Sequence, residues 1–407
     1  MRLLFVSTAH SYRNNDFIAA ADVLGIQYML FCDGAGVSTQ RHVYLEFLQD
    51  AELLRRVKDL HAEQSFRAVM ALDDSGANIA ARIATALHLP HNRLEAIAAA
   101  RDKALMRTAL SNAGVAVPQF RRYNASSQLP QLLAELIFPC VIKPLLLNGS
   151  RGVIRVDSPD EFIQARLIVL AMLEELEGKD GEHAFLVESF IPGIEVALEA
   201  ILDNGTLYPL AIFDKPDPLD GPLFEETIYV TPSRLPASVQ TDIIDTARAA
   251  AHAIGLVSGP VHAELRINES GVWVVEVAGR SIGGLCSRTL RFGVSDSLEV
   301  LILRQAMGTF RPIEPTDAHA SGVMMIPIPN PGILQQVNGI SAAAAVASIE
   351  SIEITSPLHQ PIRTLPAGES YLGFIFARAA TPEAVEVALR EAHACLEITI
   401  TPYFLLT

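Results

Sequence analysis

The first part of the chain alternates short apolar runs with a segment of helical periodicity. The runs RLLFVS, IQYMLFCD and FRAVMALDD predict buried strands, and DFIAAADVLG predicts a helix that ends at Gly25. Strands that alternate with helices are typical of a doubly wound α/β domain with a parallel sheet. The third run ends in Asp73 and Asp74, at the position where ligands of such sheets usually bind. The simpler interpretation is that both aspartates cap the helix predicted over 76–88.

Farther along the chain, paired strands replace this alternation. A continuous helical segment is predicted over 92–113, and FPCVIKPLLLNGSRGVIRV after it predicts two strands around a loop. AFLVESFIPGIEVALEAIL predicts two more strands, joined by a tight turn at Pro192 and Gly193. The polar stretch 216–234 predicts an ordered loop over a site.

A helix over 240–254 precedes a β-hairpin over 262–278, and Pro312 and Pro315 then mark a linker. The last part mixes short strands with the amphipathic helix TPEAVEVALREAHACL, which indicates an α+β appendage. We therefore predict three domains, over 1–95, 96–310 and 311–407.

The hairpin concentrates charged residues on one face. Alternation along its first strand places His262, Glu264 and Arg266 together, opposite a row of apolar residues. Glu276 is the one charge in the second run, VWVVEVA. It lies opposite Glu264 if the connecting loop has an odd number of residues centred on Ser270.

Two facing carboxylates repel each other unless a cation lies between them. Mg²⁺ prefers such oxygen ligands and shares its remaining positions with water and substrate phosphates. Arg280, four residues after Glu276, adds a planar fork suited to a transferring phosphoryl group. The pattern therefore predicts a metal-phosphate site, with an ordinary surface hairpin and solvated acids as the alternative.

Composition narrows the class of protein and of partner. The chain has 407 residues, half of them hydrophobic, and a net charge of −15, which argues against nucleic acid or an anionic membrane as the main partner. The four cysteines are scattered and indicate reduced thiols, and no apolar run approaches the roughly 18 residues of a membrane span. We expect a cytoplasmic protein with small-molecule substrates, and leave open whether it forms a homodimer.

In order and spacing, the charged residues resemble those of the ATP-grasp superfamily. The segments HAELRI, VVEVAGRSIGG and LGFIFARA are most similar to the bacterial L-amino-acid ligases, and the resemblance covers nearly the whole chain. It implies an ATP-grasp architecture with an N-terminal Rossmann-like domain, a lid over about 139–195 and a C-terminal α+β domain. It also implies an ATP-dependent ligase that joins two L-amino acids through an acyl phosphate and releases ADP and phosphate.

The resemblance gives each charged residue a role. It implies nucleotide contacts from Lys103, Lys143, Gly149, Ser150, Gly152, Glu188, Ser189, Ile191 and Glu195. The two lysines contact the α- and β-phosphates, Glu188 begins the hinge beside adenine, and Glu195 takes the ribose hydroxyls. Glu264 and Glu276 hold Mg²⁺, with Mn²⁺ as an alternative metal, and Arg280 clamps the γ-phosphate.

Three further residues carry open alternatives. His262 orients substrate or takes a proton from the incoming amine, or is a hydrogen-bonded structural residue. Gly283 and Gly284 line the pocket for the activated carboxylate, or only allow a turn with positive φ.

The sequence also departs from the superfamily pattern. Ala278 stands where many members have a metal-binding Asn, and the phosphate loop has few glycines. A biotin-carboxylase-like or nucleotide-biosynthesis enzyme, or a non-catalytic ATP-binding protein, remains the alternative. Against carboxylation, Ser281 to Gly284 follow the arginine in place of a Val-Glu-His run.

Overall fold

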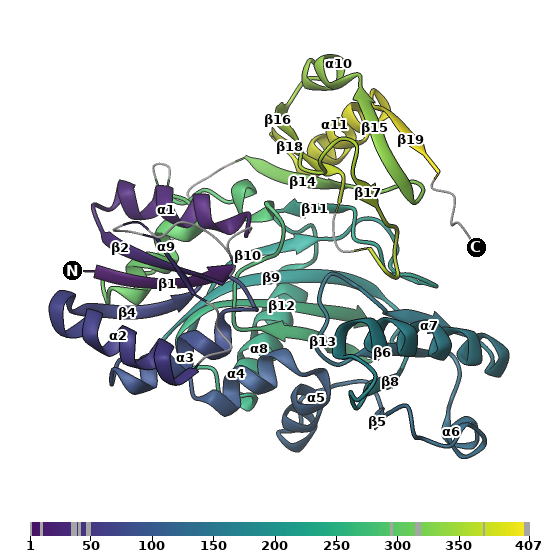
Figure 1. The fold of residues 1–407 in the computed structure, drawn as a ribbon. Coiled ribbons are helices and arrows are strands. Elements are labelled where there is room, and N and C mark those ends of the chain that lie inside the picture. The colour runs from purple at the N-terminus through teal and green to yellow at the C-terminus, as the bar shows by residue number, and fades with distance from the viewer. Residues whose placement is uncertain are drawn as a thin grey trace.

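Four β-sheets organise the part of the chain that the computed structural model describes, residues 2–8, 11–33, 39, 42–45, 50–293, 296–313, 319–368 and 371–402. The N-terminal sheet is parallel, in the order β3-β2-β1-β4, and comprises β1 (Arg2–Thr8), β2 (Gln27–Asp33), β3 (His42–Leu45) and β4 (Phe66–Ala71). Its helices are α1 (Arg13–Val23), α2 (Asp50–Gln64) and α3 (Ala77–Ala86). The doubly wound domain predicted from the alternation is confirmed (Figure 1).

The helical segment after this domain is broken, in contrast to the prediction. α4 (Leu94–Arg101) ends at Asp102, whose extended backbone starts α5 (Lys103–Asn112). The Asp102 side chain caps α5 by accepting hydrogen bonds from the amides of Ala104 and Leu105. The break therefore places Lys103 in the first turn of a new helix.

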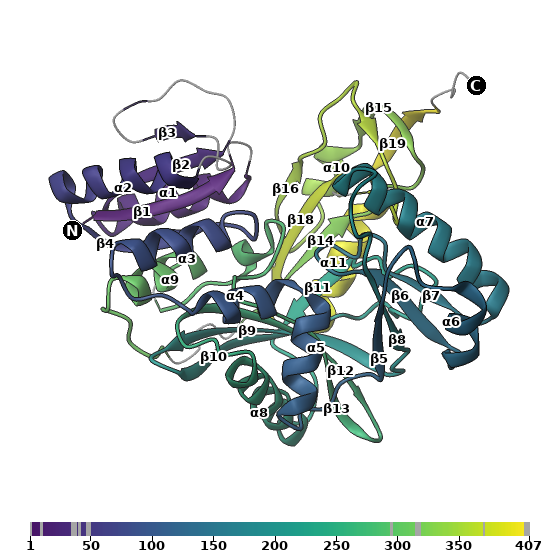
Figure 2. The same ribbon diagram turned by 60° about the horizontal axis from the view of Figure 1, so that its bottom comes forward.

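A four-stranded antiparallel sheet, in the order β5-β8-β6-β7, lies in the part of the chain predicted as the lid, and we call it the lid. It comprises β5 (Phe120–Tyr123), β6 (Cys140–Pro144), β7 (Ile154–Val156) and β8 (Phe185–Ser189), with α6 (Leu129–Glu135) and α7 (Pro159–Glu177). The lid sheet thus includes a strand at 120, ahead of the boundary predicted at 139, because β5 pairs with β8. Figure 2 shows α7 lying over this sheet.

The largest sheet has eight strands in the order β13-β12-β9-β10-β11-β14-β18-β16. Its strands are β9 (Ile194–Asp203), β10 (Thr206–Asp214), β11 (Ile228–Thr231), β12 (Gly259–Asn268), β13 (Gly271–Ala278), β14 (Ala320–Ile326), β16 (Ile349–Ile354) and β18 (Gly373–Ala379). β11 lies inside the stretch 216–234 that was predicted as loop, and it pairs with both β10 and β14. The C-terminal part therefore continues the central sheet and is more than an appendage.

The remaining C-terminal elements complete this part. They are a three-stranded sheet of β15 (Gly332–Asn338), β17 (Pro361–Ile362) and β19 (Glu397–Thr401), with α10 (Ile340–Ala344) and α11 (Pro382–Ala394). Pro315 of the predicted linker lies outside the described residues. None of the described helices combines the length and the apolar character that a membrane crossing requires.

Two helices cover the central sheet from opposite sides. α8 (Ala237–Ala253) buries Ile243, Ala247 and Ala250 against the apolar face of β9, β12 and β13 (Figure 1). α9 (Leu298–Ala306) packs on the other face together with the N-terminal domain. Because side chains alternate along a strand, the polar residues of β9 and β12 face away from α8, and they form the floor of the site.

Candidate active site

A cavity of about 650 Å³ lies between the lid, the central sheet, the N-terminal domain and the C-terminal strands. Of the residues singled out in the sequence, those that line it are Asp73, Asp74, Lys103, Lys143, Gly149, Ser150, Glu188, Ser189, Ile191, Glu195, His262, Glu264, Arg266, Glu276, Arg280, Gly283 and Gly284. They come from segments spread over most of the chain. The structure places Gly152 outside this lining.

The hairpin brings the two predicted metal ligands face to face. Glu264 pairs directly with Glu276 in the β12–β13 ladder, as predicted. The reason differs from the prediction, because Asn268 pairs with Gly271 and the loop holds only two residues. A loop of this length alone would set Glu264 opposite Val275. A β-bulge at Val275 shifts the register by one residue and restores the carboxylate pair.

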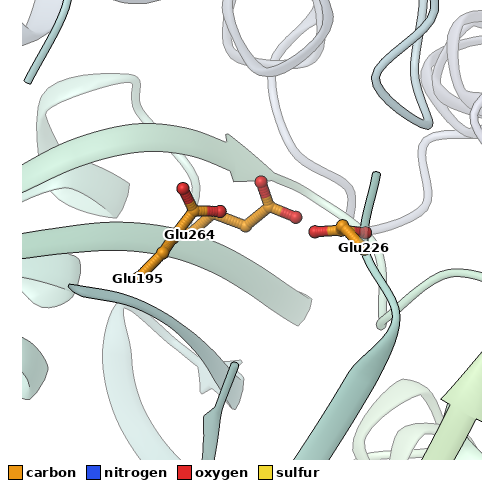
Figure 3. A group of neighbouring side chains, drawn as sticks. All are labelled: Glu195, Glu226 and Glu264. Carbon is orange, nitrogen blue, oxygen red and sulfur yellow. The ribbon is translucent and has the colours of Figure 1, made fainter. Parts of the chain in front are cut away.

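Next to Glu264 lies a cluster of acids around one lysine. Ligand oxygens of Glu195, Glu226 and Glu264 lie within 4.8 Å of one another, and Figure 3 shows their carboxylates converging. The ammonium of Lys215 lies 2.8 Å from Glu195 and 3.5 Å from Glu264, and it also donates to Glu226. Arg266 binds the second oxygen of Glu195 at 2.8 Å. With both oxygens held by cations, the ribose role of Glu195 stays a prediction.

Burial and charge act in opposite directions on this cluster. Burial alone would lower the pKa of Lys215, but the three surrounding glutamates outweigh it and raise that pKa well above its ordinary value. Burial would raise the pKa of Glu264, and the charge of Lys215 reverses this, so its pKa lies well below the usual range. For Glu226, burial prevails and the pKa is raised. Glu264 is therefore an ionised carboxylate, the form that a metal ion binds.

His262 lies between two carboxylates on the floor of the site. Its Nδ1 contacts Glu199, and its Nε2 lies 3.3 Å from Oε1 of Glu264. Burial would lower its pKa, but the carboxylate of Glu199, with help from Glu264, raises the pKa to about 9. A protonated imidazole donates to both glutamates and has no lone pair for the proton of an amine. This geometry favours the orienting role over the proton-accepting role.

Two buried cations, Arg107 and Lys143, meet at Glu188. Lys143 Nζ lies 2.5 Å from Oε2 of Glu188, and Arg107 binds the other oxygen, also at 2.5 Å. Lys103 donates to the carbonyl oxygen of Leu147 at 2.6 Å and lies 3.6 Å from Glu276. The carboxylate of Glu188 thus holds the lysine that the sequence assigned to phosphate.

This arrangement predicts a large stability effect for Glu188→Gln. The change leaves Arg107, which is 1% exposed, and Lys143 without a counter-charge. We expect the free energy of unfolding to fall by about 3–5 kcal/mol, measured by urea denaturation followed by circular dichroism. The matched control is Glu182→Gln, because Glu182 pairs with Arg122 on the open surface. Equal losses of stability in the two variants would contradict the role of Glu188 as the counter-charge of Arg107 and Lys143.

The phosphate loop has the backbone of an anion-binding turn. Gly149, Ser150 and Gly152 all have positive φ, between 57° and 69°. In the described part of the chain, the amides of Gly149 and Ser150 have no hydrogen-bond partner, so they are available to phosphate oxygens. The amide of Gly152 instead donates to the carbonyl of Pro366 at 2.9 Å, and its Cα packs on Pro144. The amide of Gly152 thus anchors the loop, and the nucleotide contact of this residue stays a prediction.

Arg280 enters the cavity from the end of β13. Its Nε donates to Oδ2 of Asp74 at 2.6 Å, and its Nη1 donates to the carbonyl of Ser281 at 2.9 Å. Burial would raise the pKa of Asp74, but the charge of Arg280 outweighs burial and lowers it. The neighbouring Asp73 accepts the amide of Gly76, the N-cap residue of α3, but no side chain caps the first turn of that helix. The predicted capping by the two aspartates is therefore wrong, and a ligand contact at this end of the sheet stays a prediction.

A second lobe of the cavity is lined by apolar and aromatic residues. They include Leu285, Met325, Tyr371 and Phe374, beside Gly283 and Gly284. Gly284 has φ of 59°, and a Cβ there would lie 2.8 Å from the ring of Phe374. Gly283 has no such restriction, and a Cβ there meets open space. The turn with positive φ is therefore present at Gly284 and not at Gly283, and the pocket for the activated carboxylate stays a prediction for both residues.

Several charged residues of the site were not predicted as site residues. Arg107 lies one helical turn after Lys103, and this spacing places both on one charged face of the helix, but it does not reveal the contact of Arg107 with Glu188. Lys215 follows β10 directly and Glu226 precedes β11. Neither could be found without recognising β11, because that strand brings them together.

Comparisons with known proteins match two parts of the chain and its fold as a whole. An ATP-grasp domain model matches residues 136–289, and the model of L-amino acid ligase C-terminal domain 2 matches residues 324–401. The structure of an L-amino acid ligase from Bacillus licheniformis is similar over 98% of both chains, with a TM-score of 0.85 and 25% sequence identity.

Two curated relatives share part of the chain. The alanine–anticapsin ligase of Bacillus subtilis strain 168 is 29% identical over 203 residues, 45% of this chain and 42% of that protein. An L-arginine-specific L-amino acid ligase of Bacillus subtilis is 25% identical over 260 residues, 62% of this chain and 60% of that protein. The chain thus aligns with less than two thirds of the length of either relative. The domain matches and the full-length structural match confirm the resemblance seen in the sequence, and the chain belongs to the ATP-grasp superfamily, in the group with the L-amino acid ligase C-terminal domain.

Proposed function

We propose that the protein is an ATP-dependent ligase that forms an amide bond between two L-amino acids through an acyl phosphate. The observation that carries this proposal is the direct pairing of Glu264 with Glu276 in a cavity that also contains Arg280 and two lysines. The relatives named above as amino acid ligases support the substrate class. We also propose the three domains predicted from the sequence, over 1–95, 96–310 and 311–407, with a lid that begins at residue 120.

The donor set of the hairpin fits a divalent cation such as Mg²⁺. Glu264 and Glu276 offer carboxylate oxygens on one face, and the ionised state of Glu264 is held by Lys215 and His262. Ala278 has no ligand atom and is buried. When bound, such an ion neutralises phosphate charge during transfer. It would be held by the two glutamates together with water and phosphate oxygens.

The other residues place and stabilise the reacting groups. Lys103, Lys143 and the amides of Gly149 and Ser150 bind the phosphates of ATP, and Arg280 faces the γ-phosphate. A carboxylate oxygen of the first amino acid attacks the γ-phosphorus, and ADP leaves. The amine of the second attacks the acyl carbon, phosphate leaves with the carboxylate oxygen, and the amine loses a proton. The site supplies positioning and charge, and no nucleophilic side chain is required.

The experiment that tests this function is a screen of L-amino acid pairs for ADP release, with the product identified by mass. We expect at least one pair to give ADP, phosphate and the condensed product in equal amounts. ADP release that depends on bicarbonate and not on an amino acid would favour a carboxylase. An inert protein that binds ATP without turnover would favour a decayed site.

The apolar lobe predicts a preference for a first amino acid larger than alanine. Gly283→Leu adds a side chain where the cavity is open and leaves the backbone unstrained. We expect it to lower kcat/KM for leucine, methionine and phenylalanine relative to alanine by about 10-fold, equivalent to ~1.4 kcal/mol of fit. Measuring kcat/KM across these substrates checks this, and an unchanged order of preference would place the pocket elsewhere. Gly284→Trp is a poorer test because its positive φ adds backbone strain.

A further inference from the structure

Arg280 is held from the N-terminal domain by two separate contacts. Its side chain donates to Oδ2 of Asp74 at 2.6 Å. Its neighbour Ser281 is fixed by Arg13 of α1, whose Nη2 donates to the Ser281 carbonyl at 2.8 Å and whose Nη1 reaches the Leu72 carbonyl at 3.5 Å. Arg13 thus ties the backbone after Arg280 to the residues just before Asp74.

Asp74 itself lies on a rigid segment. The preceding Asp73 accepts the hydroxyl of Ser7 at 3.0 Å and the amide of Gly76 at 3.2 Å. Gly76 lies so close to β1 that a Cβ on it would be 2.7 Å from the carbonyl oxygen of Val6. The carboxylate of Asp74 is therefore a fixed point, and Arg280 must adjust to it.

The same oxygen of Asp74 also holds the phosphate loop. Asn148 Nδ2 donates to Oδ2 at 3.3 Å, and the other end of the loop is anchored where the Gly152 amide meets Pro366. Gly149 and Ser150, with their unpartnered amides, lie between these two anchors. Among the described residues none is hydrogen-bonded to Nη2 of Arg280, so this end of the fork remains for a phosphoryl group.

From this arrangement we propose that Asp74 is a positioning residue that sets Arg280 and the phosphate loop in register for phosphoryl transfer. The inference rests on the proposed function and adds a residue to it. A misplacement of about 1 Å can cost roughly a hundredfold in rate. A carboxylate shared by the arginine and the loop prevents such a shift without touching ATP itself.

The kinetic test uses Asp74→Ala and the isosteric Asp74→Asn. We expect kcat to fall by about 10- to 100-fold, with KM for ATP changed by less than about threefold. Because part of the Asp74 effect acts through Arg280 and part through the loop, the double variant Asp74→Ala/Arg280→Ala should be slower than Arg280→Ala by clearly less than the factor that Asp74→Ala costs alone. Multiplied effects in the double variant, or a rise confined to KM for an amino acid, would overturn the proposal.

Hydrogen exchange provides a readout that needs no turnover. In the wild type, Mg·AMP-PNP should slow exchange of the amides at 148–152, and Asp74→Asn should lose most of this protection. The matched control is Asp16→Asn. Asp16 forms a similar ion pair with Arg288, with 3.0 Å between the two side chains, and neither residue lines the cavity. It should behave as wild type in both assays.

The outcomes separate the two proposals. If the wild type fails to bind Mg·AMP-PNP, the proposed function is wrong. If it binds and Asp74→Asn matches the wild type in exchange and in kcat, the function stands and the role of Asp74 is refuted.

Discussion

Replacing Glu264 or Glu276 with glutamine is expected to lower kcat at least about a hundredfold without unfolding the protein. Each amide removes one anionic ligand from the facing pair, while Lys215 keeps its contacts with Glu195 and Glu226. The measurement is kcat as a function of Mg²⁺ concentration, together with the thermal midpoint.

The matched control for this pair is Glu269→Gln at the exposed tip of the same hairpin. It changes charge by the same amount but lies away from the facing carboxylates. We expect its kcat and its Mg²⁺ dependence to equal those of the wild type. If the two ligand variants also keep kcat within about tenfold, the hairpin is not the metal site.

Arg280→Lys is expected to lose nearly as much activity as Arg280→Ala, about 10²–10³-fold in kcat. The guanidinium uses Nε for Asp74 and Nη1 for Ser281, which leaves Nη2 for the phosphoryl group. A lysine has one ammonium nitrogen, which cannot reach Asp74, the Ser281 carbonyl and the phosphoryl group at the same time. The measurement is kcat with saturating substrates, with Arg288→Lys as a control outside the cavity. Recovery of activity in Arg280→Lys would show that charge alone is sufficient.

Local sequence patterns predicted the parts of the site that lie within one hairpin or one loop. Strict alternation along β12 placed His262, Glu264 and Arg266 together, because a strand exposes every second residue to the same side. The bulge at Val275 could not be predicted. The carbonyl group of Val275 accepts a hydrogen bond at 2.6 Å from Arg107, which lies on a helix remote in sequence.

Contacts between distant segments account for the rest of what was missed. Asp74 and Arg280 are 206 residues apart, and no local pattern links them. Lys215 and Glu226 come together only because β11 pairs with β10 on one side and with β14 of the C-terminal part on the other. The helix break at Asp102 had a local signal, since aspartate is a common N-cap. Because apolar residues recur at helical spacing on both sides of Asp102, the segment was nevertheless predicted as one continuous helix. These contacts depend on which distant segments pair in the folded chain, and the periodicity of the sequence does not specify that pairing.

An isotope experiment tests most directly whether the reaction passes through an acyl phosphate. The first amino acid is supplied with ¹⁸O in both carboxylate oxygens, and the released phosphate and nucleotide are examined by mass spectrometry. If the carboxylate attacks the γ-phosphorus and phosphate later leaves with that oxygen, one ¹⁸O should appear in inorganic phosphate for each amide bond formed. Label found in AMP, or phosphate without label while the amide product accumulates, would contradict it.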